Sequence, residues 1–418
     1  MNTVIVNGGK RLAGEVRIGG SKNAALPVLF GGIVTGEVCV FSALPRVSDV
    51  LRSLEILHAM GARIRFLENK DVSVDYSTVR PVLPPPQLTG AIRGSTYLLG
   101  SMLARFGSAC LAGAGGCDFG TRPIDQHLRG FAALGATTQE GEILRLSAPN
   151  GLAGADITLA MPSVGATANL LLAAVTASGE TVIRNAAAEP HVVALAEFLC
   201  AAGAKIEGIG TDTVRICGVS RLHGVAHRII PDMIEAGTYL CMGMACEGPV
   251  TVTEVCPAHL TALLDAFGEM GGEVKAGCDW VRVACPHKYR NIGLETAPYP
   301  GFPTDLHPQL TALFSLGDRA EGIGVMRERI WQERFRYVRG LSKMGADITV
   351  TGDRAIVCPV PLHAAAVSAP DLRGGAAILL AMLATNAKSE LLNARMLSRG
   401  YEHLERKLTA LGACVRAY

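Results

Sequence analysis

The sequence lacks a strong charge bias and a long apolar run. Its 39 Lys and Arg residues are nearly balanced by 37 Asp and Glu residues, which leaves a formal net charge of +2. No overall basic field therefore favours nucleic acid or an anionic membrane. The most weakly charged stretch, residues 161–179, contains Ser, Thr, Asn and Gly, whereas a membrane span needs about 20 predominantly apolar residues. We expect no nucleic-acid partner and no membrane insertion.

The sequence also lacks the usual signs of export, disulfide bonding and metal binding. Its first nine residues, MNTVIVNGG, have neither the basic start nor the apolar core of a signal peptide. The 12 cysteines are scattered, without a CxxC pair, and no His cluster has metal-ligand spacing. We therefore expect a cytoplasmic location, reduced thiols that are mostly apolar core residues, no metal and no cofactor.

A helix-like pattern that ends in glycine recurs six times. Each copy is an amphipathic stretch, such as VVALAEFLCAAGAKI at residues 192–206, which ends in Gly-Ala or Gly-Gly and runs into a predicted strand. Subtraction gives intervals of 74, 68, 68, 74 and 67 residues between the glycines, so one unit is repeated. The six glycines are Gly61, Gly135, Gly203, Gly271, Gly345 and Gly412.

Each repeat also predicts a second helix that is apolar nearly all round and should therefore be buried, with strands wrapped around it. A chain of 418 residues favours two domains, so we expect an α/β protein with three repeats per domain and a break near residues 223–230. The buried helices are predicted to start near Lys22, Arg93, Ser163, Asp232, Asp305 and Asp371.

The polar residues at these helix starts have two interpretations. Ser and Asp are ordinary helix caps. Lys22, Arg93 and Arg373 do not fit capping, because cations are disfavoured at the positive end of a helix. Their position indicates an anionic ligand, for which helix N-termini are suited.

Several motifs resemble one family along the whole chain. They are GSKNAALP at 20–27, AGGCDFGTRPID at 114–125, PSVGATAN at 162–169, NAAAEP at 185–190, PDMIEAGT at 231–238, PTDLHPQ at 303–309, and DLR with RGYE at 371–373 and 399–402. In this order they resemble the UDP-N-acetylglucosamine 1-carboxyvinyltransferases, which are enolpyruvyl transferases. The glycine-rich cysteine motif is the most specific of them.

The resemblance implies a fold, a reaction and its substrates. The fold has two inside-out, barrel-like α/β domains around an interdomain cleft, each made of three βαβαββ units. Here the domains would be residues 20–228, and residues 1–19 with 229–418. The reaction moves the enolpyruvyl group of phosphoenolpyruvate to the 3-hydroxyl of UDP-N-acetylglucosamine and releases phosphate, which is the first committed step of peptidoglycan synthesis.

The resemblance also implies three catalytic residues. Cys117 matches the family cysteine that acts as general acid and is alkylated by fosfomycin, and its glycine-rich loop is suited to a lid. A neighbouring carboxylate, Asp118, would raise the pKa of the thiol, whereas Arg122 would lower it. Asp305 matches the general base, although a helix cap is its simpler interpretation. Lys22 matches a residue that grips phosphoenolpyruvate.

The remaining predicted contacts also follow from the resemblance. Arg122 and Arg399 would hold phosphoenolpyruvate together with Lys22, Arg93 would lie near the diphosphate or the lid, and Asn23 would touch the sugar. The uridine would be held by Arg122, Pro123, Ile124, Asp125, His127, Ser163, Val164 and Gly165, with Trp331 covering the uracil ring. Glu189, Asp232, Arg334, Asp371 and Arg373 would complete the polar lining, or form salt bridges instead.

The sequence departs from the family text at a few positions. Met233 stands where Arg is common, Trp331-Gln332-Glu333 replaces Phe-Glu-Asn, and His307 interrupts DLQPQ. None of these changes removes a predicted acid, base or phosphate contact. Two alternatives stay open, namely an enolpyruvyl transferase with another acceptor, such as 3-phosphoshikimate or a different nucleotide, and a non-catalytic sugar-nucleotide sensor.

Overall fold

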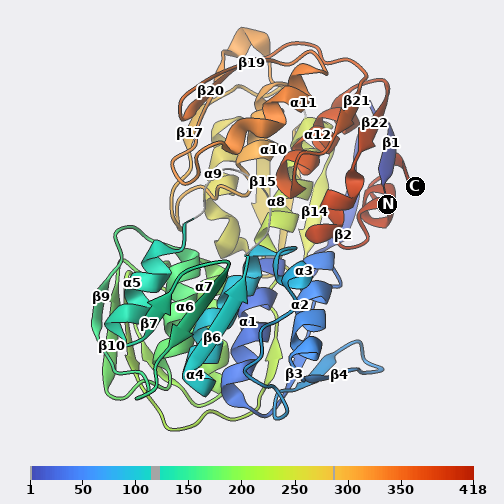
Figure 1. The fold of residues 1–418 in the computed structure, drawn as a ribbon. Helices are drawn as coiled ribbons and strands as arrows, with labels where there is room; N and C mark the ends of the chain where they lie inside the picture. Colours follow the sequence, from blue (N-terminus) through green and yellow to red (C-terminus); the bar gives the residue numbers. More distant parts are fainter. Residues whose placement is uncertain (1, 114–122, 286–287) are drawn as a thin grey trace. The chain divides into compact units, whose positions relative to one another are not determined.

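The computed structural model describes residues 2–113, 123–285 and 288–418, which fold into two compact units (Figure 1). We call residues 20–113 and 123–230 the first unit, and residues 2–19 and 231–418 the second unit. Each unit combines helices with several small sheets, as the α/β prediction requires.

Six small sheets are present in the described part of the chain, three in each unit. The five four-stranded sheets share one pattern, in which an edge strand runs parallel to its neighbour and the remaining pairs are antiparallel. Their orders are β13-β3-β5-β4, β9-β10-β12-β11, β2-β14-β16-β15, β17-β18-β20-β19 and β21-β22-β1-β23, and the three-stranded sheet is β6-β8-β7. The sixfold repeat of the sequence therefore appears as six sheets.

The strands of the first unit are β3 (Val38–Ser42), β4 (Arg63–Phe66), β5 (Val72–Asp75), β6 (Ser108–Ala112), β7 (Thr137–Gln139), β8 (Ile143–Ser147), β9 (Asp156–Thr158), β10 (Glu180–Arg184), β11 (Lys205–Glu207), β12 (Thr213–Cys217) and β13 (Ala226–Arg228). The strands of the second unit are β1 (Thr3–Asn7), β2 (Gly14–Arg17), β14 (Val250–Thr253), β15 (Glu273–Ala276), β16 (Trp280–Ala284), β17 (Gly293–Glu295), β18 (Gly324–Arg327), β19 (Asp347–Thr351), β20 (Arg354–Cys358), β21 (Ala366–Ser368), β22 (Lys388–Leu392) and β23 (Cys414–Ala417).

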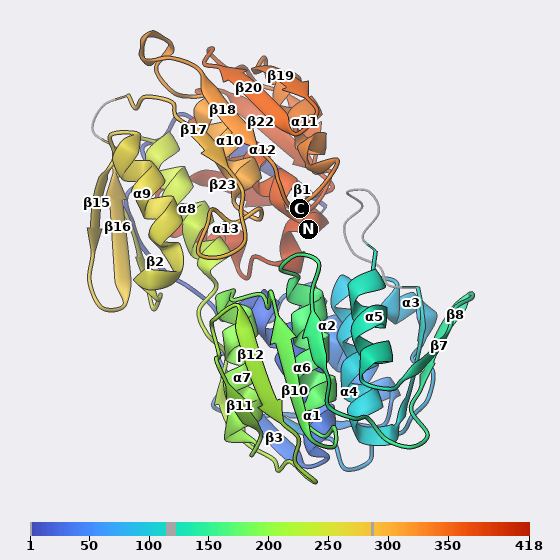
Figure 2. The same cartoon turned by 90° about the vertical axis from the view of Figure 1, so that its left-hand side faces the viewer.

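Three apolar helices form the centre of each unit, as Figure 2 shows. In the first unit, every residue of α1 from Ala24 onwards is buried, because its apolar side chains leave no polar face for solvent. The same holds in the second unit for α12, where Leu372 to Leu383 are buried. These helices are α1 (Lys22–Thr35), α4 (Tyr97–Phe106), α6 (Val164–Ala174), α8 (Met233–Ala245), α10 (His307–Phe314) and α12 (Leu372–Ala384). The predicted burial of this helix type is confirmed.

Six further helices precede the predicted glycines. They are α2 (Ser48–Ala59), α5 (Asp125–Ala133), α7 (Pro190–Ala201), α9 (Thr261–Glu269), α11 (Val338–Ser342) and α13 (Leu404–Ala410). All six glycines have φ between 90° and 105°, a backbone conformation that is costly for residues with a Cβ atom. The glycine signal therefore located the helix ends correctly. The short helical segments are α3 (Pro86–Thr89), η1 (Arg93–Thr96), η2 (Pro257–Leu260), η3 (Arg319–Glu321), η4 (Arg334–Tyr337) and η5 (Ala394–Arg399).

The two ends of the chain meet in one sheet of the second unit. Strand β1 lies between β22 and β23, and Thr3 exchanges backbone hydrogen bonds of 3.2 and 2.9 Å with Tyr418. Another sheet of this unit pairs β2 in parallel with β14, more than 230 residues further along the chain. The amino-terminal strands therefore belong to the unit built mainly from the carboxyl-terminal half.

The cysteine expectation is only partly right. All eleven described cysteines are free thiols, as predicted, but only Cys39, Cys241, Cys246 and Cys285 are buried. Burial raises the pKa of Cys241 well above its usual value and that of Cys246 to about 12, so both thiols stay protonated. Three others, Cys217, Cys278 and Cys414, are exposed on strands or turns, where they do not contribute to a core.

The turn before β14 supplies a test of the packing in the second unit. A Cβ atom on Gly248 would lie 1.6 Å from the Leu12 carbonyl oxygen, whereas one on Gly268 in α9 would meet nothing within 4 Å. We expect Gly248→Ala to lower the free energy of unfolding by at least about 1–3 kcal/mol, because the backbone must move. Gly268→Ala should be neutral or slightly stabilising.

Urea unfolding followed by tryptophan fluorescence measures this difference, because both tryptophans, Trp280 and Trp331, belong to the second unit. Equal unfolding midpoints for the two variants would contradict the close approach at Gly248.

Candidate functional site

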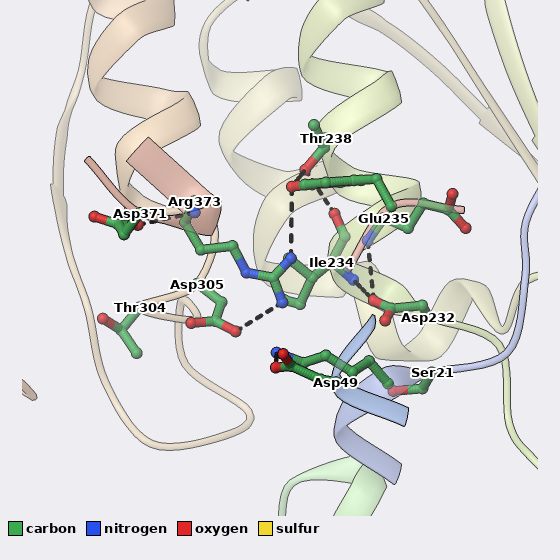
Figure 3. Close-up of polar contacts among 12 residues, drawn as sticks. Ser21, Asp49, Asp232, Ile234, Glu235, Thr238, Thr304, Asp305, Asp371 and Arg373 are labelled. Atoms are coloured by element: carbon green, nitrogen blue, oxygen red, sulfur yellow. Dashed lines mark hydrogen bonds and ion pairs between the residues drawn. The ribbon is translucent and has the colours of Figure 1, made fainter. Parts of the chain in front are cut away.

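The carboxylate of Asp305 is held by two buried arginines in the second unit. Figure 3 shows one of them, Arg373, with its guanidinium directed at the carboxylate. Arg334 Nη2 lies 2.9 Å from Asp305 Oδ1, and Arg373 Nη2 lies 3.0 Å from Asp305 Oδ2. The arginine side chains are 2% and 4% exposed, whereas that of Asp305 is 29% exposed. The structure therefore brings together three predicted site residues and leaves the carboxylate open to solvent.

Arg373 reaches Asp305 from the first turn of α12. Asp371 caps this helix, since its carboxylate accepts hydrogen bonds of 2.9 Å from the backbone N–H groups of Arg373 and Gly374. Burial alone would lower the pKa of Arg373, but the negative charge of Asp305, with smaller effects of Tyr401 and Asp232, raises it above its usual value. The guanidinium therefore stays charged although it is buried.

A chain of hydroxyl groups continues from Arg373. Its Nη1 donates to the Tyr401 hydroxyl over 3.5 Å, and that hydroxyl lies 2.9 Å from Thr238 Oγ1. Thr238 in turn donates to the Ile234 carbonyl in α8 over 2.7 Å. Asp232 caps the same helix through bonds of 2.8 and 3.0 Å to the N–H groups of Ile234 and Glu235. The capping interpretation is therefore right for both Asp371 and Asp232.

Asp305 itself is not a helix cap. Helix α10 begins at His307 and is preceded by Leu306, so Asp305 lies in the loop before the helix. Arg93 also differs from the prediction, because it begins the 3₁₀ turn η1, and the buried helix α4 starts only at Tyr97. The six polar positions are thus not equivalent, and the simpler interpretation of Asp305 was wrong.

Lys22 occupies the first turn of α1 in the first unit, with Asn23 next to it. Its Nζ lies 3.3 Å from Asp49 Oδ2, and the two side chains are 13% and 6% exposed. The preceding Ser21 caps the helix by accepting from the Ala24 N–H over 3.3 Å. A buried carboxylate thus compensates the cation at the positive end of the helix, which the sequence analysis did not foresee.

A second group of predicted residues gathers around His127 in the first unit. Ser163 caps α6, which begins with Val164 and Gly165. A Cβ atom on Gly165 would lie only 2.8 Å from His127 Nε2, so the imidazole packs directly against the start of this helix. Burial, and to a lesser degree the charge of Arg93, lowers the pKa of His127 to about 4. The structure therefore brings together Arg93, His127 and the start of α6.

The neighbouring residues of the predicted uridine motif are more exposed. Pro123 is exposed, half-buried Ile124 precedes α5, and Asp125 begins that helix. The Asp125 carboxylate lies 3.7 Å from Arg129 Nη2 on the same helix, and both side chains are at least half exposed. An ion pair of this kind contributes little to stability.

The remaining predicted residues are half-buried. Trp331 follows β18, and its backbone N–H donates to Glu328 Oε1 over 3.0 Å. Arg399 ends the 3₁₀ segment η5, and Glu189 precedes α7. Two predicted residues, Cys117 and Arg122, lie outside the described residues.

Sequence reasoning missed three residues beside the predicted site. Asp49 pairs with Lys22, Tyr401 contacts Arg373, and Glu328 binds the Trp331 backbone. Each is buried and polar. Only Tyr401 had a local signal, because it belongs to the RGYE motif at residues 399–402, whereas Asp49 and Glu328 lie in none of the family motifs.

Among the residues that the structure describes, no group of three or more His, Cys, Asp or Glu side chains could hold a metal ion. No helix in the described ranges is long and apolar enough to cross a membrane.

The comparisons with known proteins agree over the whole chain. The family model of EPSP synthase (3-phosphoshikimate 1-carboxyvinyltransferase) matches residues 6–408. The chain belongs to the EPSP synthase family. It is 43% identical over 417 residues to a UDP-N-acetylglucosamine 1-carboxyvinyltransferase of Halothermothrix orenii, with 100% of this chain and 99% of that protein covered. The predicted membership of the enolpyruvyl transferases, and with it the transferase class, is confirmed.

Solved structures in this family share the fold. The enolpyruvyl transferase NikO from Streptomyces tendae matches with a TM-score of 0.89 and 27% identity, covering 99% of this chain and 98% of its own. An EPSP synthase from Acinetobacter baumannii matches with a TM-score of 0.75 and 18% identity, covering 100% and 99%. The second likeness concerns the fold alone. The predicted fold class is confirmed.

The environment of His127 predicts its titration. Because its folded pKa is below the value of about 6.5 for an unfolded chain, unfolding takes up a proton. The contribution of His127 to the free energy of unfolding is complete above pH 6.5 and is lost as the pH falls towards 4. At pH 5 we expect about 2 kcal/mol to be lost.

An NMR titration of the His127 imidazole should give a midpoint of about 4. Arg93→Met should raise that midpoint, because the nearby positive charge is removed. Arg129→Met, which removes an exposed arginine of α5, is the matched control and should leave the midpoint in place. A wild-type midpoint near 6.5 would contradict the packing of His127 against α6.

Proposed function

We propose that this protein transfers the enolpyruvyl group of phosphoenolpyruvate to the 3-hydroxyl of UDP-N-acetylglucosamine and releases phosphate. The observation that carries the proposal is the similarity over the full chain, at 39–43% identity, to proteins named UDP-N-acetylglucosamine 1-carboxyvinyltransferase. The chain covers 98–99% of these relatives, so nearly all of their length has a counterpart here.

The chemistry requires an acid, a base and cations. Addition of an alcohol to C2 of the enol phosphate needs a proton delivered to C3 and a proton taken from the hydroxyl. Elimination of phosphate then removes a proton from C3. The phosphate and the carboxylate of phosphoenolpyruvate must be neutralised throughout. In this proposal Cys117 delivers the proton to C3, and Lys22, Arg122 and Arg399 hold the two anionic groups.

Asp305 is the proposed base for the sugar hydroxyl, and its surroundings support this role. Each of its oxygens already accepts one charge-assisted bond, from Arg334 or from Arg373. A carboxylate has about four acceptor positions, and a substrate hydroxyl would donate to the part of this side chain that is 29% exposed. The two arginines therefore orient the carboxylate without using all of its acceptor capacity.

The sugar nucleotide needs further contacts, which we assign to predicted residues. Asn23 would contact the sugar, and Arg93 the diphosphate. The start of α6 would receive the uridine, together with Pro123, Ile124, Asp125 and His127. Trp331 offers an indole ring for stacking on uracil. Since His127 is neutral at physiological pH, its imidazole offers both a hydrogen-bond donor and an acceptor.

The acceptor decides between this function and a close alternative. Phosphate release should require both phosphoenolpyruvate and UDP-N-acetylglucosamine, and prior incubation with fosfomycin should abolish it. Shikimate 3-phosphate in place of the sugar nucleotide should give no release. If phosphate were released only with another nucleotide or only with shikimate 3-phosphate as acceptor, the assigned acceptor would be wrong and the reaction class would stand. Binding of the sugar nucleotide without turnover of any acceptor would indicate a sensor.

The proposed acid and base can be tested separately. We expect Asp305→Ala and Cys117→Ser each to lower kcat by at least about 100-fold, because each removes a proton-transfer group. The exposed Asp347 provides the matched control, and Asp347→Ala should retain wild-type turnover. Circular dichroism checks that the variants are folded. Wild-type kcat in a folded Asp305→Ala variant would exclude Asp305 as the base.

A further inference from the structure

Glu328 is a fully buried carboxylate that lies directly after β18. Its side chain is 0% exposed, and it is not among the residues that the proposed chemistry uses. Burying a carboxylate is costly unless hydrogen bonds or a counter-charge compensate the loss of water. The identity of its partners therefore indicates what the residue does.

Four donors compensate the Glu328 carboxylate. Oε1 accepts from Thr296 Oγ1 at 3.0 Å, from the Ile330 N–H at 2.7 Å and from the Trp331 N–H at 3.0 Å. Oε2 accepts from Thr304 Oγ1 at 2.8 Å. A carboxylate supplies about four acceptor positions, so these donors account for its whole capacity. One side chain thus binds three separate segments of the second unit.

Two of these segments carry proposed site residues. Thr304 directly precedes Asp305, and Figure 3 shows the two side by side in the loop before α10. Arg334 Nη2 bonds both to the Thr304 carbonyl, over 3.4 Å, and to Asp305 Oδ1. The second of the two N–H groups that bond Glu328 belongs to Trp331. Glu328 therefore binds the side chain that directly precedes the proposed base and the backbone at Trp331, three residues before Arg334.

His307 packs beside this carboxylate without pairing with it. Its Nδ1 lies 3.9 Å from Glu328 Oε2, and its Nε2 lies 3.4 Å from the Tyr337 hydroxyl. Burial, together with the nearby charge of Arg334, lowers the pKa of His307 well below 6.5, so the imidazole is neutral. The Glu328 carboxylate therefore accepts four hydrogen bonds and forms no ion pair with the neutral His307.

We propose that Glu328 is a positioning residue, which holds Asp305 through Thr304 and holds Trp331 through its backbone N–H. It does not touch the substrate. The inference rests on the proposed function, because it takes Asp305 as the base of an enolpyruvyl transfer. Errors of about 1 Å in the position of a reacting group can cost on the order of 100-fold in rate.

Three substitutions separate the position of the carboxylate from its charge. Glu328→Gln keeps the shape and leaves Oε1 for its three donors, while its amide can donate to Thr304 Oγ1. Glu328→Ala removes all four bonds, and Thr304→Val removes only the bond beside Asp305. We expect kcat to fall at least tenfold in Glu328→Ala, to fall less in Thr304→Val, and to stay closest to wild type in Glu328→Gln. The KM for phosphoenolpyruvate should change little.

The decisive comparison repeats Thr304→Val in the Asp305→Ala variant, which lacks the proposed base. If Glu328 acts through Asp305, then Thr304→Val should lower kcat in the wild type but not in Asp305→Ala. The same fractional loss in both backgrounds, or no loss in either, would overturn the proposal. The control Glu321→Ala removes an exposed glutamate of the same unit and should have no effect. Turnover is measured with whichever acceptor supports phosphate release, so a wrong acceptor leaves this test intact.

A fluorescence measurement tests the role of Glu328 even if the protein turns over none of the acceptors. Trp280→Phe leaves Trp331 as the sole tryptophan of the chain. In that background, Glu328→Ala should shift the emission of Trp331 to longer wavelength and increase its quenching by acrylamide, whereas Glu328→Gln should resemble the parent. Unchanged emission and quenching in Glu328→Ala would overturn the proposal independently of activity.

Discussion

The charge of two buried arginines is the constraint on which the polar structure of the second unit depends. Arg334 and Arg373 are almost fully removed from water, and an uncompensated buried charge is strongly destabilising. Asp305 forms an ion pair with each of them, and it does so from a loop, so the position of that loop is tied to α12 and to η4. The same carboxylate remains 29% exposed, so it is accessible for the proton-acceptor role that we propose for it.

The buried helices explain why such polar groups occur at helix starts. A helix that is apolar all round can be covered only by other helices and by sheets, and the three central helices of each unit meet this need together. Their first turns still carry N–H groups without intrahelical partners. Ser21, Ser163, Asp232 and Asp371 satisfy some of these groups as caps. The surroundings of the helix starts are therefore polar for a structural reason, and the same property suits anionic substrates.

Local features of the sequence were sufficient to predict the repeat, the helix ends and several caps. A glycine at a helix end and an all-apolar helix each indicate the same local structure wherever they occur. Their sixfold recurrence therefore predicted the repeat that appears, in the described part of the chain, as six sheets and six buried helices. The partners of the charged residues could not be predicted from local features in this way. Asp49 lies 27 residues from Lys22, and Arg373 lies 68 residues from Asp305, so these pairs depend on tertiary folding. The capping interpretation failed at Asp305, because Leu306 holds the cap position and the helix begins one residue later than a cap at Asp305 would require.

A double-mutant cycle on the pair of Asp305 and Arg373 tests the account most directly. The free energies of unfolding of the second unit would be measured by tryptophan fluorescence for the wild type, Asp305→Ala, Arg373→Met and the double variant. We expect a coupling energy of at least about 1 kcal/mol, because Asp305→Ala leaves the buried Arg373 guanidinium without its carboxylate, whereas the same substitution in Arg373→Met strands no charge at position 373. Additive effects, with a coupling energy below about 0.3 kcal/mol, would contradict it.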